Sequence, residues 1–102
     1  MNASNNNIRY VSASGAVLEG DDTIVIDSRG GPRTLAMPHT TAVEGKRVTV
    51  KRKFNGGSTV TLTSAFGDSF DGDTTYSLIN DFQSVSFRAS DGVWLVTATA
   101  NS

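Results

Sequence analysis

The chain has no cysteine, which excludes disulfide bonds and metal centres with thiolate ligands. It has no apolar run near the roughly 20 residues that a membrane-spanning helix requires. The segment 1–7 has neither the basic nor the apolar stretch of a secretory signal. We therefore expect no membrane partner, and a protein that is made and assembled in a cytoplasm.

An excess of basic residues is also missing. The nine Lys and Arg residues are outnumbered by ten Asp and Glu residues, which gives a net charge of −1. Proteins that bind nucleic acid usually carry a basic excess, so we expect no nucleic-acid partner. Hydrophobic residues make up 37% of the chain, so a single copy has little apolar surface to bury. Self-association would add to that burial.

Sequence patterns typical of catalytic and metal sites are missing. His39 is the single histidine, and no nucleophile-elbow motif accompanies it. Asp68, Asp71 and Asp73 surround Gly72, but their spacing does not match a calcium-binding EF-hand loop. Asp and Gly are ordinary turn residues, and calcium binding remains the weaker interpretation. We expect no enzymatic activity, no metal and no cofactor.

Segments that alternate apolar and polar residues dominate the chain. The clearest are residues 47–53 and 59–63, which flank the turn sequence Asn55-Gly56-Gly57. Alternation places side chains on opposite faces of a strand, and glycine supplies the positive φ of a tight turn. The pattern predicts a hairpin whose buried face is formed by Val48, Val50, Val60 and Leu62.

Similar short segments recur along the chain and are separated by glycine turns. They are residues 8–13, 23–27, 33–37, 75–78, 83–89 and 93–97. No segment keeps a helical period, so we expect an all-β protein. The prediction is an antiparallel β-sandwich or jelly-roll-like domain of seven to nine short strands over residues 8–102. Residues 1–7 are expected to be a flexible N-terminal arm.

A stripe of cations lies on one face of the segment 47–53. Arg47, Lys51 and Lys53 alternate with Val48 and Val50 and therefore point away from the buried side. One interpretation is a solvated outer face, and the other is a surface that docks on an acidic protein. The stripe is our candidate partner-facing surface, together with the arm residues Asn5, Asn6 and Asn7.

Four of the eight aromatic residues are expected in the core or at a subunit interface. These residues are Tyr76, Phe82, Phe87 and Trp94. The last strand carries apolar residues on both faces, because Trp94 alternates with Val93 and Leu95. A strand that is apolar on both sides is buried on both sides, which favours an oligomer.

The order of these segments resembles a small β-domain of tailed-bacteriophage virion proteins, including tail-fibre tips, head fibres and capsid decoration proteins. The matching series covers residues 18–96. It runs through Thr23-Ile24-Val25-Ile26-Asp27, Gly30-Gly31-Pro32, Leu35-Ala36-Met37-Pro38, Gly45-Lys46-Arg47-Val48-Thr49-Val50-Lys51-Arg52, Thr59-Val60-Thr61-Leu62, Phe70-Asp71-Gly72, Thr75-Tyr76-Ser77-Leu78, Gln83-Ser84-Val85-Ser86-Phe87 and Asp91-Gly92-Val93-Trp94-Leu95-Val96. Met37 stands where leucine is expected, and Phe70 where isoleucine is commoner.

The resemblance implies a homotrimer without enzymatic activity that is located in the virion. Because the domain fills nearly the whole chain, with no shaft before it, we expect a capsid decoration or cement protein. Its partners would be its own copies and the major capsid protein or another virion protein. The alternative is a tail-fibre or receptor-binding tip module that recognises a glycan or protein of the host surface.

Overall fold

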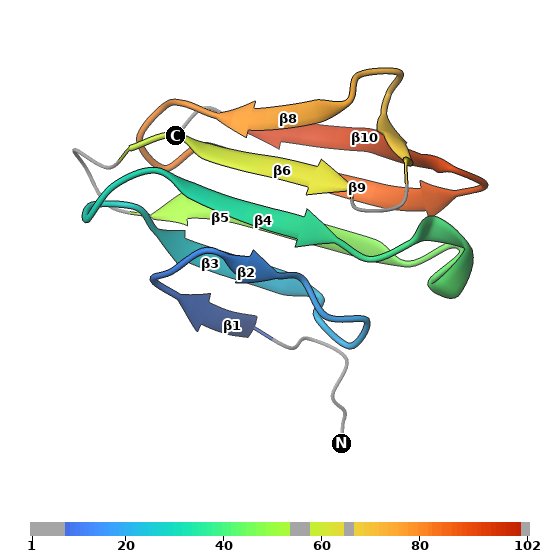
Figure 1. The fold of residues 1–102 in the computed structure, drawn as a ribbon, viewed down its shortest axis with the longest axis horizontal. Coiled ribbons are helices and arrows are strands. Elements are labelled where there is room, and N and C mark those ends of the chain that lie inside the picture. Colours follow the sequence, from blue (N-terminus) through green and yellow to red (C-terminus); the bar gives the residue numbers. More distant parts are fainter. Residues whose placement is uncertain (1–7, 54–57, 65–66, 101–102) are drawn as a thin grey trace.

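The computed structural model describes residues 8–53, 58–64 and 67–100, and its regular structure is almost entirely β (Figure 1). A single 3-10 turn, η1, spans Thr40–Ala42. The ten strands are β1 (Ile8–Val11), β2 (Gly15–Ala16), β3 (Thr23–Asp27), β4 (Arg33–Met37), β5 (Arg47–Lys53), β6 (Val60–Ser64), β7 (Ser69–Phe70), β8 (Thr75–Leu78), β9 (Ser84–Ser90) and β10 (Val93–Ala100).

The strands form two sheets that lie one over the other (Figure 1). Sheet A has the order β1-β3-β5-β9-β10-β7, and sheet B has the order β2-β4-β6-β8. From β1 to β6 the chain changes sheet at every strand. The expected all-β class is therefore confirmed, with two facing layers as in a sandwich.

The expected antiparallel pairing is wrong for most of the molecule. Five of the eight strand pairs are parallel, namely β1/β3, β3/β5, β2/β4, β4/β6 and β10/β7. Parallel neighbours need a crossover between them. For the pairs among β1 to β6, one strand of the other sheet provides it, whereas both β8 and β9 lie between β7 and β10 in the sequence. The described strands number ten rather than seven to nine, because two-residue strands such as β2 and β7 are too short to show alternation.

The expected hairpin between residues 47–53 and 59–63 is also wrong. β5 belongs to sheet A and β6 to sheet B, while residues 55–57 lie outside the described residues. The four expected apolar side chains are all fully buried. They meet in the core from opposite sheets. The same alternation of apolar and polar residues therefore fits two strands of one hairpin and two strands in facing sheets. By contrast, β9 and β10 do form an antiparallel hairpin, in which Asp91 (φ 43°) and Gly92 (φ 87°) make the turn.

The core is a single layer of side chains between the sheets. Its buried members are Val17, Ile24, Ile26, Leu35, Met37, Val48, Val50, Val60, Leu62, Phe70, Leu78, Val85, Phe87, Ala89 and Trp94. Phe87 stands at its aromatic centre. The ring centroids of Phe70 and Tyr76 are 5.5 Å from it, and that of Trp94 is 6.4 Å away. Rings at these separations add to the stabilisation that burial alone provides.

Sheet A ends at β1. At this edge of the core, Arg9 of β1 forms an ion pair with Asp21. Arg9 is in register with buried Ile24, so its side chain extends toward the inner side of the sheet. Its guanidinium donates to the carboxylate of Asp21 at 2.8 Å and to the carbonyl of Ala16 at 2.9 Å. The Leu18 amide also donates to Asp21, at 2.7 Å. An inward charge on an edge strand discourages pairing with a further strand.

Replacement of Trp94 by alanine is expected to reduce the free energy of unfolding by about 3–5 kcal/mol, because a fully buried large aromatic side chain leaves a cavity. Leu95→Ala is the matched control on the same strand. Leu95 is 40% exposed, and its loss should cost below about 1 kcal/mol. Urea unfolding followed by circular dichroism measures both, and equal losses would contradict this packing.

Acid is expected to remove the contribution of the Arg9–Asp21 pair. Burial raises the pKa of Asp21, but hydrogen bonds from Arg9 and the Leu18 amide outweigh it and hold that pKa below 3.8. A carboxylate with a lowered folded-state pKa stabilises the protein above its unfolded-state pKa. That contribution disappears as the pH falls through the folded-state pKa. Wild-type protein should therefore exceed Asp21→Asn in urea resistance near pH 7 and lose that advantage progressively as the pH falls below 3.8. A constant difference between the two proteins would contradict the assignment.

Candidate docking face

The expected cation stripe lies on the outer face of sheet A. Along β5, Val48 and Val50 are buried, whereas Arg47 is exposed and Lys51 and Lys53 are half-buried on the opposite side. Strand alternation alone explains this arrangement. The face is large, because the molecule is a slab with principal extents of 37 × 35 × 22 Å.

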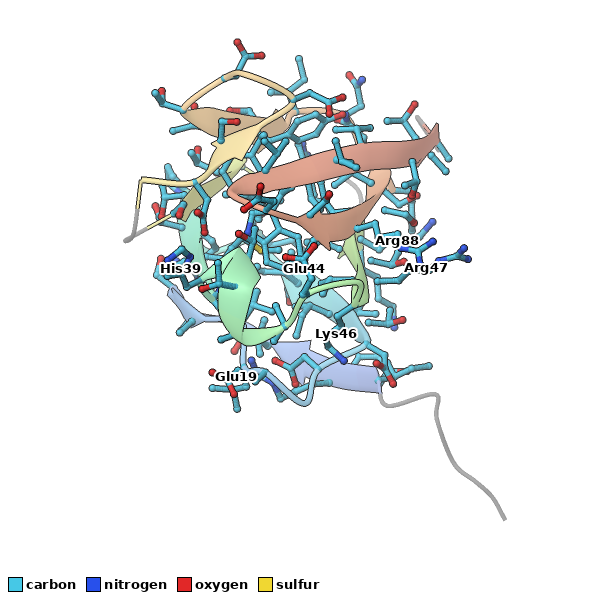
Figure 2. All side chains as sticks on the ribbon, turned by 90° about the vertical axis from the view of Figure 1, so that its right-hand side faces the viewer. Glu19, His39, Glu44, Lys46, Arg47 and Arg88 are labelled. Carbon is cyan, nitrogen blue, oxygen red and sulfur yellow. The ribbon has the colours of Figure 1, made fainter. Side chains whose placement is uncertain are left out.

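A second arginine lies beside the stripe. Arg88 of β9 is directly in register with Arg47 of β5, and both side chains project from the slab on the same side (Figure 2). Within the described part of the chain, neither guanidinium has an ion pair or hydrogen bond. Arg88 could not be predicted as part of this surface, because only the pairing of β5 with β9 brings it to the stripe. Pairing between strands so far apart in the sequence leaves no local signal.

Hydroxyl groups separate the cations along the sheet. Thr49 of β5 and Ser86 of β9 are in register, and their side-chain oxygens are 2.9 Å apart, which makes a hydrogen bond. The next outward pair is Lys51 with Ser84. The central strands therefore present guanidinium, hydroxyl and ammonium groups in successive rows about 7 Å apart.

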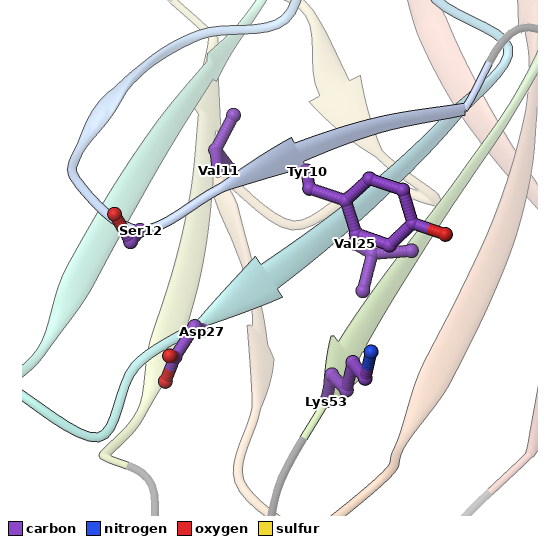
Figure 3. A pocket seen from close by; sticks show the side chains of 6 residues that line it. All are labelled: Tyr10, Val11, Ser12, Val25, Asp27 and Lys53. Carbon is purple, nitrogen blue, oxygen red and sulfur yellow. The ribbon is translucent and has the colours of Figure 1, made fainter.

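The face continues to β1, where Tyr10 is 68% exposed. The ammonium of Lys53 lies 5.5 Å from the centroid of the Tyr10 ring, within range of a cation–π contact. A shallow pocket of about 240 Å³ opens here (Figure 3). Its lining residues are Tyr10, Val11, Ser12, Val25, Asp27 and Lys53.

Among the described strands of sheet A, Asp27 is the one acidic residue. It pairs with Arg29 at 2.8 Å. Hydrogen bonds from the Arg29 side chain and amide lower the pKa of Asp27 to about 2. Its charge is thus matched locally, and the rest of the outer face keeps its positive character.

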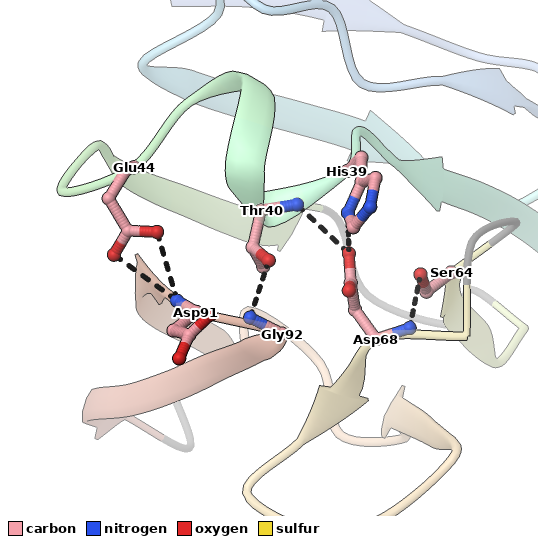
Figure 4. Close-up of polar contacts among 7 residues, drawn as sticks. All are labelled: His39, Thr40, Glu44, Ser64, Asp68, Asp91 and Gly92. Atoms are coloured by element: carbon pink, nitrogen blue, oxygen red, sulfur yellow. Dashed lines mark hydrogen bonds and ion pairs between the residues drawn. The ribbon is translucent and has the colours of Figure 1, made fainter.

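His39 belongs to a separate group of contacts at the end of the slab (Figure 4). Its Nδ1 lies 3.0 Å from a carboxylate oxygen of buried Asp68, and the same oxygen accepts from the Thr40 amide at 2.9 Å. The Thr40 hydroxyl accepts from the Gly92 amide at 2.8 Å, and Ser64 accepts from the Asp68 amide at 3.2 Å. The contacts of Asp68 with His39 and Thr40 and that of Gly92 with Thr40 join different connections, whereas the Ser64 contact lies within the connection that follows β6. The group therefore links three connections at this end of the sandwich.

The other predicted residues fall in different places. Asn5, Asn6 and Asn7 lie outside the described residues. Trp94 and Phe87 are fully buried, Tyr76 is half-buried against Phe87, and Phe82 is a half-buried turn residue with φ of 60°.

Asp71 and Asp73 lie in exposed turn positions. The carboxylate of Asp71 accepts from the Val96 amide at 3.2 Å, whereas that of Asp68 faces His39. Among the described residues, no group of three or more His, Cys, Asp or Glu side chains could hold a metal ion. The same residues contain no helix long and apolar enough to cross a bilayer.

Comparison with models of known protein families gives no match, and comparison with curated proteins gives none either.

Asp68→Ala is expected to reduce the free energy of unfolding by about 1–3 kcal/mol, because it leaves the buried Thr40 amide without its acceptor. Asp73→Ala, an exposed turn change in the same segment, should cost below about 0.5 kcal/mol. Urea denaturation of the two variants checks this, and indistinguishable midpoints would contradict a structural role for Asp68.

Proposed function

We propose that the protein is a non-enzymatic structural protein of a tailed-bacteriophage virion. In this proposal it is a decoration or cement protein that binds the assembled head and stabilises it. The observation that carries the proposal is the outer face of sheet A, which is broad, rich in hydroxyl groups and positively charged along β5 and β9. The resemblance of residues 18–96 to virion β-domains provides the link to a phage.

The proposed mechanism is burial of surface between the slab and the shell. A standard protein interface buries about 800 Å² on each partner, and a face of 37 × 35 Å offers enough area. Because such contacts exist only in the assembled head, binding favours assembly by mass action. Cations on the face would steer the protein toward an acidic shell surface.

We further propose that the protein acts as a homotrimer. Exposed apolar side chains support self-association: Ile8, Leu18, Ile79 and Leu95 are each at least 40% exposed. A trimer would bury part of this surface and add to a core of modest apolar content. Light scattering of the purified protein would give the mass of a trimer, and a monomer at high concentration would contradict this proposal.

The pocket beside Tyr10 favours the alternative function, a tail-fibre or receptor-binding tip. An exposed aromatic ring next to hydroxyl and charged groups is the type of surface on which a sugar ring can stack and form hydrogen bonds. A decoration protein occurs in many copies on each head, whereas a fibre tip occurs in few. A stained gel of purified virions therefore separates the two functions.

Heads purified without this protein provide the direct test. The added protein is expected to cosediment with them until the sites are saturated, and to raise the temperature at which the heads release DNA. Lys51→Thr/Lys53→Thr should weaken binding, whereas Arg29→Thr, which removes a paired cation at the edge of the face, should change it little. Absence of cosedimentation at low salt would refute the decoration function.

A further inference from the structure

We infer that Arg47 and Arg88 together form a binding site for carboxylate side chains of an acidic partner protein. The two residues are directly opposed across the antiparallel β5/β9 pair. Both are exposed, and their side chains extend in the same direction into solvent (Figure 2). The assignment of the partner to a phage head rests on the proposed function, but the chemistry of the site does not.

The position of the two arginines is unfavourable without an anion. Like charges directly opposite on paired strands destabilise a sheet, and no described residue supplies a neutralising acid to either side chain. Each guanidinium presents five N–H donors in a planar fork that fits a carboxylate. A carboxylate between the two forks would turn this repulsion into two attractive contacts.

The neighbours of the pair favour a protein partner. Leu95 of β10 is in register with Arg88 and is 40% exposed, so an apolar contact lies beside the charged one. Lys51 lies on the same face four residues from Arg47, or about 14 Å along β5. Carboxylates four residues apart in an extended acidic segment match this spacing.

Nucleic acid fits the site less well. Proteins that bind single strands combine cations with aromatic rings on which bases stack. Among the described residues, the exposed ring of this face is Tyr10, which lies on β1 and is separated from β9 by β3 and β5.

Poly-L-glutamate is the probe for this site, with binding measured by calorimetry at low salt. Arg47→Thr/Arg88→Thr should weaken binding at least about tenfold, because both forks are lost. Arg29→Thr/Lys46→Thr removes the same charge from two ion-paired positions and should leave affinity within about twofold. Arg47→Lys/Arg88→Lys keeps the charge without the forks and should give an intermediate affinity.

Arg88→Glu gives a second readout that does not depend on a ligand. It replaces a repulsive cross-strand pair by an attractive one, so it should raise the urea midpoint of the free protein and abolish binding of poly-L-glutamate. If this variant is instead destabilised, the two arginines do not repel one another as described, and the inference fails.

Two results would overturn the site itself. One is equal loss of poly-L-glutamate binding in the threonine double variant and in its charge-matched control. The other is tighter binding of single-stranded oligothymidylate than of poly-L-glutamate by the wild-type protein. Failure of the protein to bind heads, with binding of poly-L-glutamate still dependent on the arginine pair, would refute the decoration function alone.

Discussion

The shared apolar layer between the two sheets is the constraint on which the rest of the structure depends. Each sheet buries one face. From β1 to β6, consecutive strands belong to opposite sheets, so the chain alternates between the two sides of this layer. Consecutive strands therefore face each other across the core instead of pairing side by side. This explains the parallel neighbours among β1 to β6, and no described element covers the outer face of sheet A.

The β1 edge of sheet A is poorly suited to pairing with a further strand. At β1, the inward side chain of Arg9 is held by Asp21 and the Ala16 carbonyl, which closes the end of the core. An additional strand at this edge would have to accommodate that ion pair. The outer face of β5 and β9 has no such obstacle, and its charges are already in place for a partner.

Much of the local structure could be predicted from the sequence, because strand alternation is a local signal. The segments 23–27, 33–37 and 75–78 were predicted with their observed bounds. The pairing could not be predicted in this way. Alternation shows which side chains are buried, but it does not show where the strand lies. The side chains of β6 would reach the same core whether β6 paired with β5 in one sheet or lay in the opposite sheet.

The same limit applies to the candidate site. Arg47, Lys51 and Lys53 share one strand, so their common face follows from spacing alone. Arg88 joins them only through the β5/β9 register, and Asp68 meets His39 only through the packing of two loops. Neither relationship has a short-range signature, and both require the three-dimensional structure.

An electron-microscopy map of decorated phage heads would test the central claim most directly. We expect density for this protein to lie flat on the shell with sheet A inward, and Arg47 and Arg88 next to acidic residues of the capsid protein. A map in which sheet A faces solvent, with the shell contacting sheet B or the loops at the ends of the slab, would contradict the account.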